Sequence, residues 1–213
     1  MPDLKKLDRR FILLSASSFA LAGCGGLGLG PTDVNDTIYM LQPALAAAPG
    51  GQPATWALAV DIPDALDSID SRRIALVRTD STLDYYANSV WPDRLPVLVQ
   101  TALVAAFEAS GRIPSVARTQ DALHADYELG TELRDCTAHY SQPDAAPTVS
   151  VTIVAQMSTA HGRKIVSSFT AKQDAAASQN STSAVVAAFN TAIGAAVAQV
   201  VGWAVALPPP PAL

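Results

Sequence analysis

The side chains that most readily form covalent or metal bonds are few in this sequence: two cysteines and three histidines. His124, His139 and His161 do not have the spacing of a metal-binding motif, and no pair of cysteines accompanies them. The sequence also lacks a Gly-x-Ser-x-Gly motif, which would hold a nucleophilic serine on a sharp turn. These residues predict neither a metal site nor a hydrolase, and we expect the protein not to be an enzyme.

Two further patterns resemble binding sites only superficially. Residues 25–31 are rich in glycine, but they lack the lysine and the Ser/Thr of a phosphate-binding loop, and no predicted strand precedes them. Asp61 and Asp64 flank Pro63 at the end of a predicted strand, where acidic side chains are usually solvated. We therefore expect no bound cofactor.

Cys24 is the residue whose covalent chemistry the sequence does predict. It follows an apolar stretch, residues 11–22, and a positively charged segment that contains Lys5, Lys6, Arg9 and Arg10. This is the order of a secretory signal, and the apolar stretch is shorter than the ~18–20 residues that span a membrane. Leu21-Ala22-Gly23-Cys24 matches the bacterial lipobox, in which the thiol receives a diacylglyceryl group. We predict cleavage between Gly23 and Cys24, which leaves Cys24 as the first residue, with diacylglycerol and an N-acyl chain attached.

The same segment bears on the export route and on the target membrane. Residues 7–13 resemble a twin-arginine export motif, and a general secretory signal that happens to hold two arginines accounts for them equally well. Gly25 and Gly26 follow Cys24, with no aspartate directly after it. By resemblance to lipoproteins of Gram-negative bacteria, this favours a lipid anchor that faces the periplasm, at the outer membrane in preference to the inner one.

Composition limits the partners and the organisation of the chain. The sequence has 14 basic and 19 acidic residues, and without residues 1–23 its net charge would be −7. A net acidic chain argues against binding to nucleic acid and against electrostatic binding to anionic lipid. We therefore expect the acyl chains to attach the protein to the membrane. We expect a flexible tether at 24–35, one domain at 36–206 and a proline-rich tail at 207–213. Cys136 then has no cysteine partner and should be a small buried apolar residue.

Hydrophobic periodicity predicts the elements of this domain. We expect helices at 92–110 and 181–207, and strands at 38–41, 56–62, 74–79, 82–86, 113–118, 127–140, 148–158 and 164–172. Asp80-Ser81 should form a hairpin turn, and the alternation in strand 127–140 slips near Asp135, which indicates a β-bulge. The fold class is therefore α/β (α+β), with one mixed, largely antiparallel sheet covered by two main helices.

The last predicted helix has an alternative interpretation. Residues 184–207 carry no charged side chain, as in a transmembrane helix. Alanine adds little to the free energy of membrane insertion, and no basic residues flank the segment. We therefore predict a helix that packs across the sheet.

Several short segments, taken in order, resemble one known family over residues 36–206. They are Tyr39-Met40-Leu41, Ile62-Pro63, Leu66-Asp67-Ser68, Arg73-Ile74, Leu83-Asp84-Tyr85-Tyr86, Trp91-Pro92-Asp93-Arg94-Leu95-Pro96, Ala125-Asp126-Tyr127-Glu128-Leu129 and Ala187-Ala188-Phe189. Together with the lipobox they resemble the ABC-type transport auxiliary lipoprotein family. Family members usually have an Arg-Trp-Ala-Glu-like block where this chain has Val90-Trp91-Pro92-Asp93, so any role of that arginine is not carried over.

The resemblance implies an accessory subunit of an MCE-domain ABC system, which moves lipids between the two membranes. The implied partners are an MCE-domain protein and the permease/ATPase complex, and the protein itself would bind no ATP. Exposed strand edges would offer sites for strand addition or for assembly of a homo-oligomer. Tyr85, Tyr86 and Trp91 are candidate interface residues because aromatic residues are enriched at hot spots, although core or helix-cap positions explain them equally well.

Two other functions agree with the same features. The first is a periplasmic lipid-binding module that holds an acyl chain between the helices and the sheet, which requires an apolar pocket there. The second is a structural envelope lipoprotein without a role in transport.

Overall fold

The computed structural model describes residues 36–45, 52–122, 124–161 and 164–210. The described residues belong to one compact unit, Asp36–Leu213. The predicted signal, the cleavage site and Cys24 lie outside the described residues, so they remain predictions.

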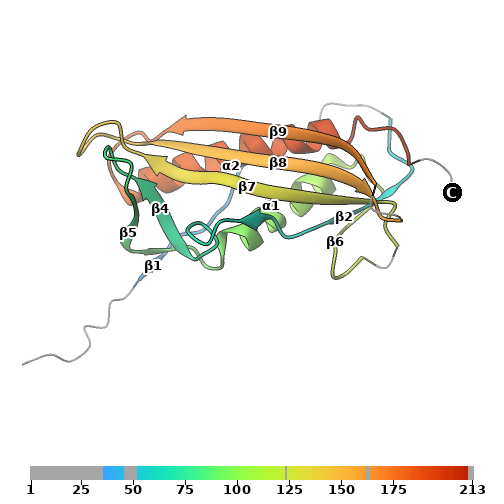
Figure 1. Cartoon of the computed structure of the whole chain (residues 1–213), viewed down its shortest axis with the longest axis horizontal. Coiled ribbons are helices and arrows are strands. Elements are labelled where there is room, and N and C mark those ends of the chain that lie inside the picture. Colours follow the sequence, from blue (N-terminus) through green and yellow to red (C-terminus); the bar gives the residue numbers. More distant parts are fainter. Residues whose placement is uncertain (1–35, 46–51, 123, 162–163, 211–213) are drawn as a thin grey trace, which may run out of the picture. The chain divides into compact units, whose positions relative to one another are not determined.

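Three long antiparallel strands form the main part of the sheet (Figure 1). They are β7 (Tyr127–His139), β8 (Thr148–Thr159) and β9 (Ile165–Ala176), and β8 lies between the other two. The register of β7 against β8 shifts between Leu133 and Asp135, which confirms the predicted bulge. The core face of β8 consists of fully buried Val149, Val151, Ile153, Ala155 and Met157. The period of two that predicted this strand thus places these side chains on one face of the sheet.

Short strands complete the sheet along the other edge of β7. In succession β7 pairs in parallel with β2 (Ala57–Val60), β3 (Asp64–Ala65) and β4 (Arg73–Val77). Beyond them lie β6 (Ser115–Arg118), parallel to β2, and β5 (Leu83–Val90), antiparallel to β4. The strand β1 (Thr37–Ile38) is parallel to β5. The result is a mixed sheet of nine strands within the described ranges, and it confirms the predicted fold class.

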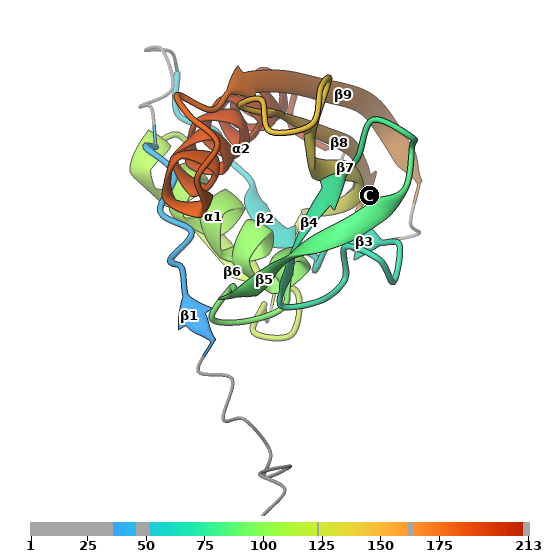
Figure 2. The ribbon, with the colours of Figure 1, turned by 90° about the vertical axis from the view of Figure 1, so that its left-hand side faces the viewer.

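The two helices pack on one face of this sheet, which curls towards them (Figure 2). They are α1 (Leu95–Ser110), which ends at Gly111 with φ of 60°, and α2 (Thr182–Ala204). Helix α1 begins later than predicted because Arg94 is extended, and Pro96, not Pro92, lies in its first turn. At the start of α2 the Ser181 hydroxyl caps the helix by accepting a hydrogen bond from the Ala184 N–H.

Helix α2 is long and apolar enough to cross a membrane, but about two thirds of its most apolar stretch is buried within the domain (67%). Ile193 and Val197 are fully buried, as are Val151 and Ile153 in β8, the strand that α2 contacts. Side chains thus fill the space between α2 and the sheet, which supports the prediction of a packed helix.

Cys136 is part of this core, with an exposed fraction of 1%. Burial is the main cause that raises the pKa of its thiol above the ordinary value. The structure therefore confirms Cys136 as a small buried apolar residue.

Candidate functional site

The polar cluster that most resembles a catalytic site lies at the end of β7. The Thr137 hydroxyl donates to Asp135 Oδ1 at 2.7 Å, and it also lies 2.9 Å from His139 Nε2. The same imidazole nitrogen lies 3.2 Å from Asp135 Oδ2. In a catalytic triad, the acid and the nucleophile contact opposite nitrogens of the ring. This cluster does not have that geometry.

The other two histidines lie at the surface. His124 and His161 are exposed. Over the residues that the structure describes, no three His, Cys, Asp or Glu side chains lie together as possible metal ligands. Two hollows of the described surface offer room for a partner or a ligand.

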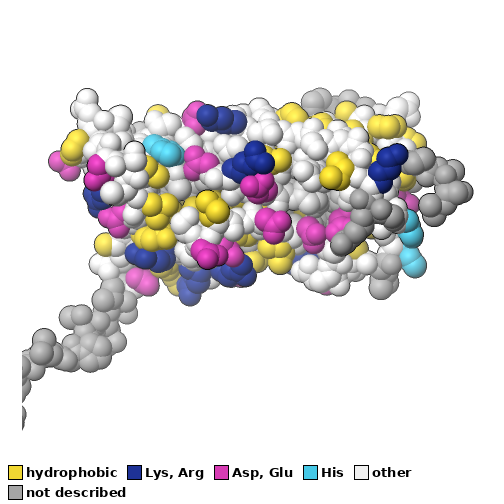
Figure 3. Space-filling model, in the orientation of Figure 1, with side chains coloured by type: hydrophobic (Ala, Val, Ile, Leu, Met, Phe, Trp, Pro, Cys, Tyr) yellow, Lys and Arg dark blue, Asp and Glu magenta, His cyan; other side chains and the backbone are white. Residues whose placement is uncertain are grey.

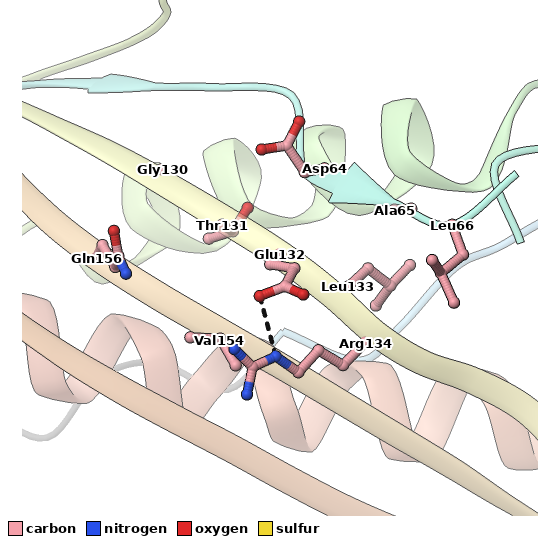
Figure 4. Close-up of a pocket in the computed structure, with 10 residues that line it drawn as sticks. All are labelled: Asp64, Ala65, Leu66, Gly130, Thr131, Glu132, Leu133, Arg134, Val154 and Gln156. Carbon is pink, nitrogen blue, oxygen red and sulfur yellow. Dashed lines mark hydrogen bonds and ion pairs between the residues drawn. The ribbon is translucent and has the colours of Figure 1, made fainter.

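One hollow of about 710 Å³ lies beside β3 on β7 and β8 (Figure 4). Its lining consists of Asp64, Ala65, Leu66, Gly130, Thr131, Glu132, Leu133, Arg134, Val154 and Gln156. Arg134 Nε donates to Glu132 at 2.9 Å, so these two charges compensate each other. Leu66 at the rim is 68% exposed. The lining shows no nucleophile beside a base, and the hollow offers contact area only.

A second hollow, of about 750 Å³, lies at the end of the molecule where the β4–β5 hairpin meets the β7–β8 connection. We call it the tyrosine groove. Its lining consists of Arg73, Leu76, Arg78, Thr79, Asp80, Asp84, Tyr85, Tyr86, Ala87, Tyr140, Pro143, Asp144 and Asn180. Hydrophobic side chains gather at this end of the molecule over β4 and β5, interleaved with charged ones (Figure 3).

A β-bulge in β5 shapes this groove. Between the pairs Arg73–Val90 and Ala75–Tyr85, β4 advances two residues while β5 advances five. Within the bulge Asn88 has φ of 51°, a left-handed conformation that asparagine tolerates better than most residues. Bulges often redirect side chains beside functional sites. Tyr86 belongs to the part of β5 that this bulge leaves without a partner in β4.

Hydrogen bonds join the far sides of the groove. The hydroxyls of Tyr86 and Tyr140 lie 2.9 Å apart, and the Tyr140 hydroxyl donates to Asn180 Oδ1 at 2.8 Å. Burial, followed by the contact with Tyr140, raises the pKa of Tyr86 above its ordinary value. Tyr86 is therefore a neutral hydroxyl near neutral pH.

Four of the five charged groups in the lining contact a partner within the groove or next to it. The guanidinium of Arg73 lies 3.6 Å from the centre of the Tyr85 ring, a cation–π contact. Arg78 Nη2 lies 2.5 Å from Asp84 Oδ2, and this hydrogen bond lowers the pKa of Asp84. The Asp80 carboxylate accepts hydrogen bonds from the Thr82 backbone N–H and hydroxyl. With two arginines and three aspartates, the lining has no excess of positive charge.

Of the three predicted interface residues, the structure places two in this groove and one in the core. Tyr85 and Tyr86 are half-buried groove residues. Trp91 is only 1% exposed and packs edge-to-face on Phe189, with 5.6 Å between ring centres. A side chain buried to this extent offers no contact area, so Trp91 is corrected to a core residue and the candidate interface is restricted to Tyr85 and Tyr86.

Sequence reasoning missed Tyr140 and Asn180 as members of the same site. They lie 54 and 94 residues after Tyr86 and reach it only through sheet pairing and the position of α2. The only sequence signal was the presence of aromatic and amide residues at the ends of predicted elements, which is weak by itself.

Comparison with known proteins agrees with this architecture. The model of the family described as ABC-type transport auxiliary lipoprotein component matches residues 39–201. The chain belongs to this family. The resemblance expected from the sequence is thereby confirmed, and the family description names no enzymatic activity.

Two solved structures show the same fold. The crystal structure of protein XCC0632 from Xanthomonas campestris has a TM-score of 0.74 and 29% identity, and the match covers 79% of this chain and 94% of that one. An uncharacterized protein has a TM-score of 0.60 at 12% identity, with coverage of 78% and 97%. This second likeness shows the fold alone.

A relative known from sequence is an uncharacterized protein of Bradyrhizobium diazoefficiens. It is 25% identical over 185 residues, which cover 87% of this chain. The chain spans about half the length of this relative (49%).

Proposed function

We propose that this family member is a membrane-anchored periplasmic accessory lipoprotein of an MCE-type ABC transporter, which assists lipid or phospholipid transport between the inner and outer membranes. The observation that carries the proposal is the family match over residues 39–201. The absence of a catalytic arrangement in the His139 cluster and in both hollows supports an auxiliary role.

The proposed anchor is the acylated Cys24. Each buried CH2 group contributes about 0.8 kcal/mol, and more than one acyl chain is needed for stable attachment. The chain of 12 residues from Cys24 to Asn35 then acts as a tether that holds the domain close to its partners. Such a tether raises the local concentration of the domain at the membrane, which strengthens weak contacts without new interactions.

The proposed partners are an MCE-domain protein and the permease/ATPase complex, and the ATPase supplies the energy. Two surfaces support protein contacts. One is the tyrosine groove with Tyr85 and Tyr86, and the other is the edge of β9, a 12-residue strand that pairs only with β8 within the described residues. An unpaired strand edge is suited to strand addition.

The alternative of a lipid-binding module receives less support. It requires an apolar cavity between the helices and the sheet, whereas Ile153 of β8 and Val197 of α2 are fully buried in a filled interface. The hollows described above are lined by strands and loops and not by α1 or α2.

Lipid movement in cells tests this proposal against a purely structural role. In a strain that lacks the gene, we would follow pulse-labelled phospholipid from one membrane to the other, with the wild-type chain or Cys24→Ala supplied from a plasmid. We expect slower transfer in the deletion strain, recovery with the wild type and no recovery with Cys24→Ala. Unchanged transfer in the deletion strain would refute a transport role.

A further inference from the structure

Three features of the tyrosine groove indicate the kind of ligand that fits it. Its lining has three tyrosine rings: Tyr85, Tyr86 and Tyr140. Asn180 uses its amide oxygen to accept from Tyr140, and no described acceptor is bonded to its Nδ2, which leaves this group available as a donor. The charged lining consists of two arginines and three aspartates, so the groove has no excess positive charge that would favour an anion.

This chemistry suits a neutral, extended peptide rich in proline. A polyproline II helix has no internal hydrogen bonds, so its carbonyl groups accept from side-chain donors such as Asn180 Nδ2. Proline rings pack on flat aromatic surfaces, and proteins that recognise such segments do so with aromatic-lined grooves. The helix is formed before binding, which reduces the entropy lost on association.

The chain itself contains such a segment, with four consecutive prolines at 208–211. The structure describes the first three, of which Pro208 and Pro209 are exposed. The hydroxyl of Tyr127 donates to the carbonyl of Pro208 at 3.1 Å, which fixes the start of this proline tail near the C-terminal end of α2. No charged side chain follows Asp174 in the sequence, so the tail brings no charged side chain that the aspartates of the groove would repel.

The tail cannot reach the groove of its own chain. Asn180 directly precedes α2 and the tail directly follows it, as the path of α2 along the sheet shows (Figure 1). With 23 residues, α2 separates them by about 35 Å at ~1.5 Å per residue. Four prolines extend only about 12 Å at ~3.1 Å per residue. Length therefore excludes these four prolines as the occupant of the groove of their own chain.

We propose that the tyrosine groove binds the proline tail of a second copy of this protein. The contact is head-to-tail, since groove and tail lie at opposite ends of the domain. Such a contact is heterologous and produces a closed ring or an open filament. The inference rests on the proposed function only in taking the groove as a contact surface, and it does not depend on which transporter the protein serves.

A peptide titration tests recognition. The probe is a labelled peptide with the sequence of residues 205–213, and the protein is the full chain in detergent with Pro209→Gly and Pro210→Gly, which vacates the groove but keeps the Tyr127–Pro208 contact. We expect saturable binding that weakens at least about tenfold in Tyr140→Ala and about threefold to tenfold in Asn180→Ala. The neighbouring Gln179→Ala is the matched control and should bind as before, and a peptide with alanine in place of proline should not bind.

Saturable binding with unchanged affinity in both Asn180→Ala and Tyr140→Ala would overturn the proposal, as would no binding at all. If Tyr140→Ala does not fold, the peptide affinity of Asn180→Ala alone tests the proposal. Asn180 is exposed and lies outside the core, so its replacement should leave the fold intact.

Cysteine cross-linking in native membranes tests the occupant. We would combine Pro210→Cys with Thr79→Cys, because Thr79 is an exposed residue of the groove, and compare it with Pro210→Cys plus Glu108→Cys on the exposed side of α1. Cys136 is buried and does not compete. We expect disulfide-linked dimers from the first pair only, with loss in Asn180→Ala. Equal cross-linking of both pairs, or monomers alone, would overturn the inference. Such a result would not bear on the proposed function, which co-isolation with a transporter tests separately.

Discussion

Replacement of Trp91 by alanine should unfold the domain more easily, because Trp91 is a core residue and not a contact residue. Its side chain is 1% exposed, packs edge-to-face on Phe189 of α2, and sits where the chain enters α1. Its backbone is held by Arg72, whose carbonyl accepts from the Trp91 N–H at 2.7 Å and whose Nε donates to the Trp91 carbonyl at 3.1 Å. The backbone is therefore unable to close the cavity that truncation leaves.

The expected loss is about 3–5 kcal/mol in the free energy of unfolding, the range for truncation of a buried tryptophan. For a domain of this size, that corresponds to a decrease in Tm of roughly 6–20 °C. The matched control is Trp203→Ala. Trp203 is only partly buried and stacks on Phe169 with 5.6 Å between ring centres, and its loss should cost about 1–2 kcal/mol.

Urea unfolding of a secreted form that begins at Asp36, followed by circular dichroism, measures both losses. A solvent-exposed interface residue would change stability by about 0.5 kcal/mol or less. If Trp91→Ala costs less than about 1 kcal/mol, or no more than Trp203→Ala, the core assignment of Trp91 is refuted.

Four further predictions concern two glycines and the two cysteines. Gly202→Ala should stabilise α2 by about 0.5–1 kcal/mol because no atom lies near the added Cβ. Gly194→Ala should destabilise the domain because its Cβ would lie 3.0 Å from the Ala44 carbonyl oxygen. Thermal unfolding of the two variants should therefore show a higher Tm for the first and a lower Tm for the second. The Cys136 thiol should resist a thiol reagent until urea unfolds the chain, and modification of the native protein at the unfolded rate would contradict its burial. Because burial raises the pKa of the Cys136 thiol, its contribution to stability should be complete below the ordinary thiol pKa of about 8.5. The contribution should decrease at higher pH, where the thiol ionises only in the unfolded state. In Cys136→Ala, the loss of stability at alkaline pH should lack the part that this thiol causes. Cys24→Ala should accumulate as an unprocessed or mislocalised chain, and normal maturation with normal membrane fractionation would refute the predicted anchor.

The parts of the fold that depend on local pattern were predictable. The period of two identified the strand at 148–158, whose five fully buried residues from Val149 to Met157 alternate along β8, and the slip near Asp135 located the bulge in β7. These succeed because a half-buried strand repeats every two residues whatever its partners are. The two-residue strand β3 was missed, since it exists only through its pairing with Glu132 and Leu133 of β7.

The candidate site was predictable only in part, because it is assembled by tertiary contacts. Tyr85 and Tyr86 were recognised as aromatic residues in a predicted strand, but the bulge in β5 next to them leaves no periodic signal. Trp91 has the same chemical character as a hot-spot residue, and only its packing on Phe189 distinguishes the two roles. Aromatic residues serve both cores and interfaces, so composition alone could not separate them.

The central claim is that the protein is an accessory component of an MCE-type ABC transporter, and isolation of the intact complex tests it most directly. The affinity-tagged full chain would be purified from its own envelope in mild detergent, with quantitative mass spectrometry of the proteins that remain, and Cys24→Ala and an unrelated tagged lipoprotein would serve as controls. We predict that a permease, an ATPase and an MCE-domain protein are purified with the wild-type chain in a fixed ratio. We predict that these subunits are absent from both control purifications. Purification of the lipoprotein without these subunits, or equal recovery with the unrelated lipoprotein, would contradict the account.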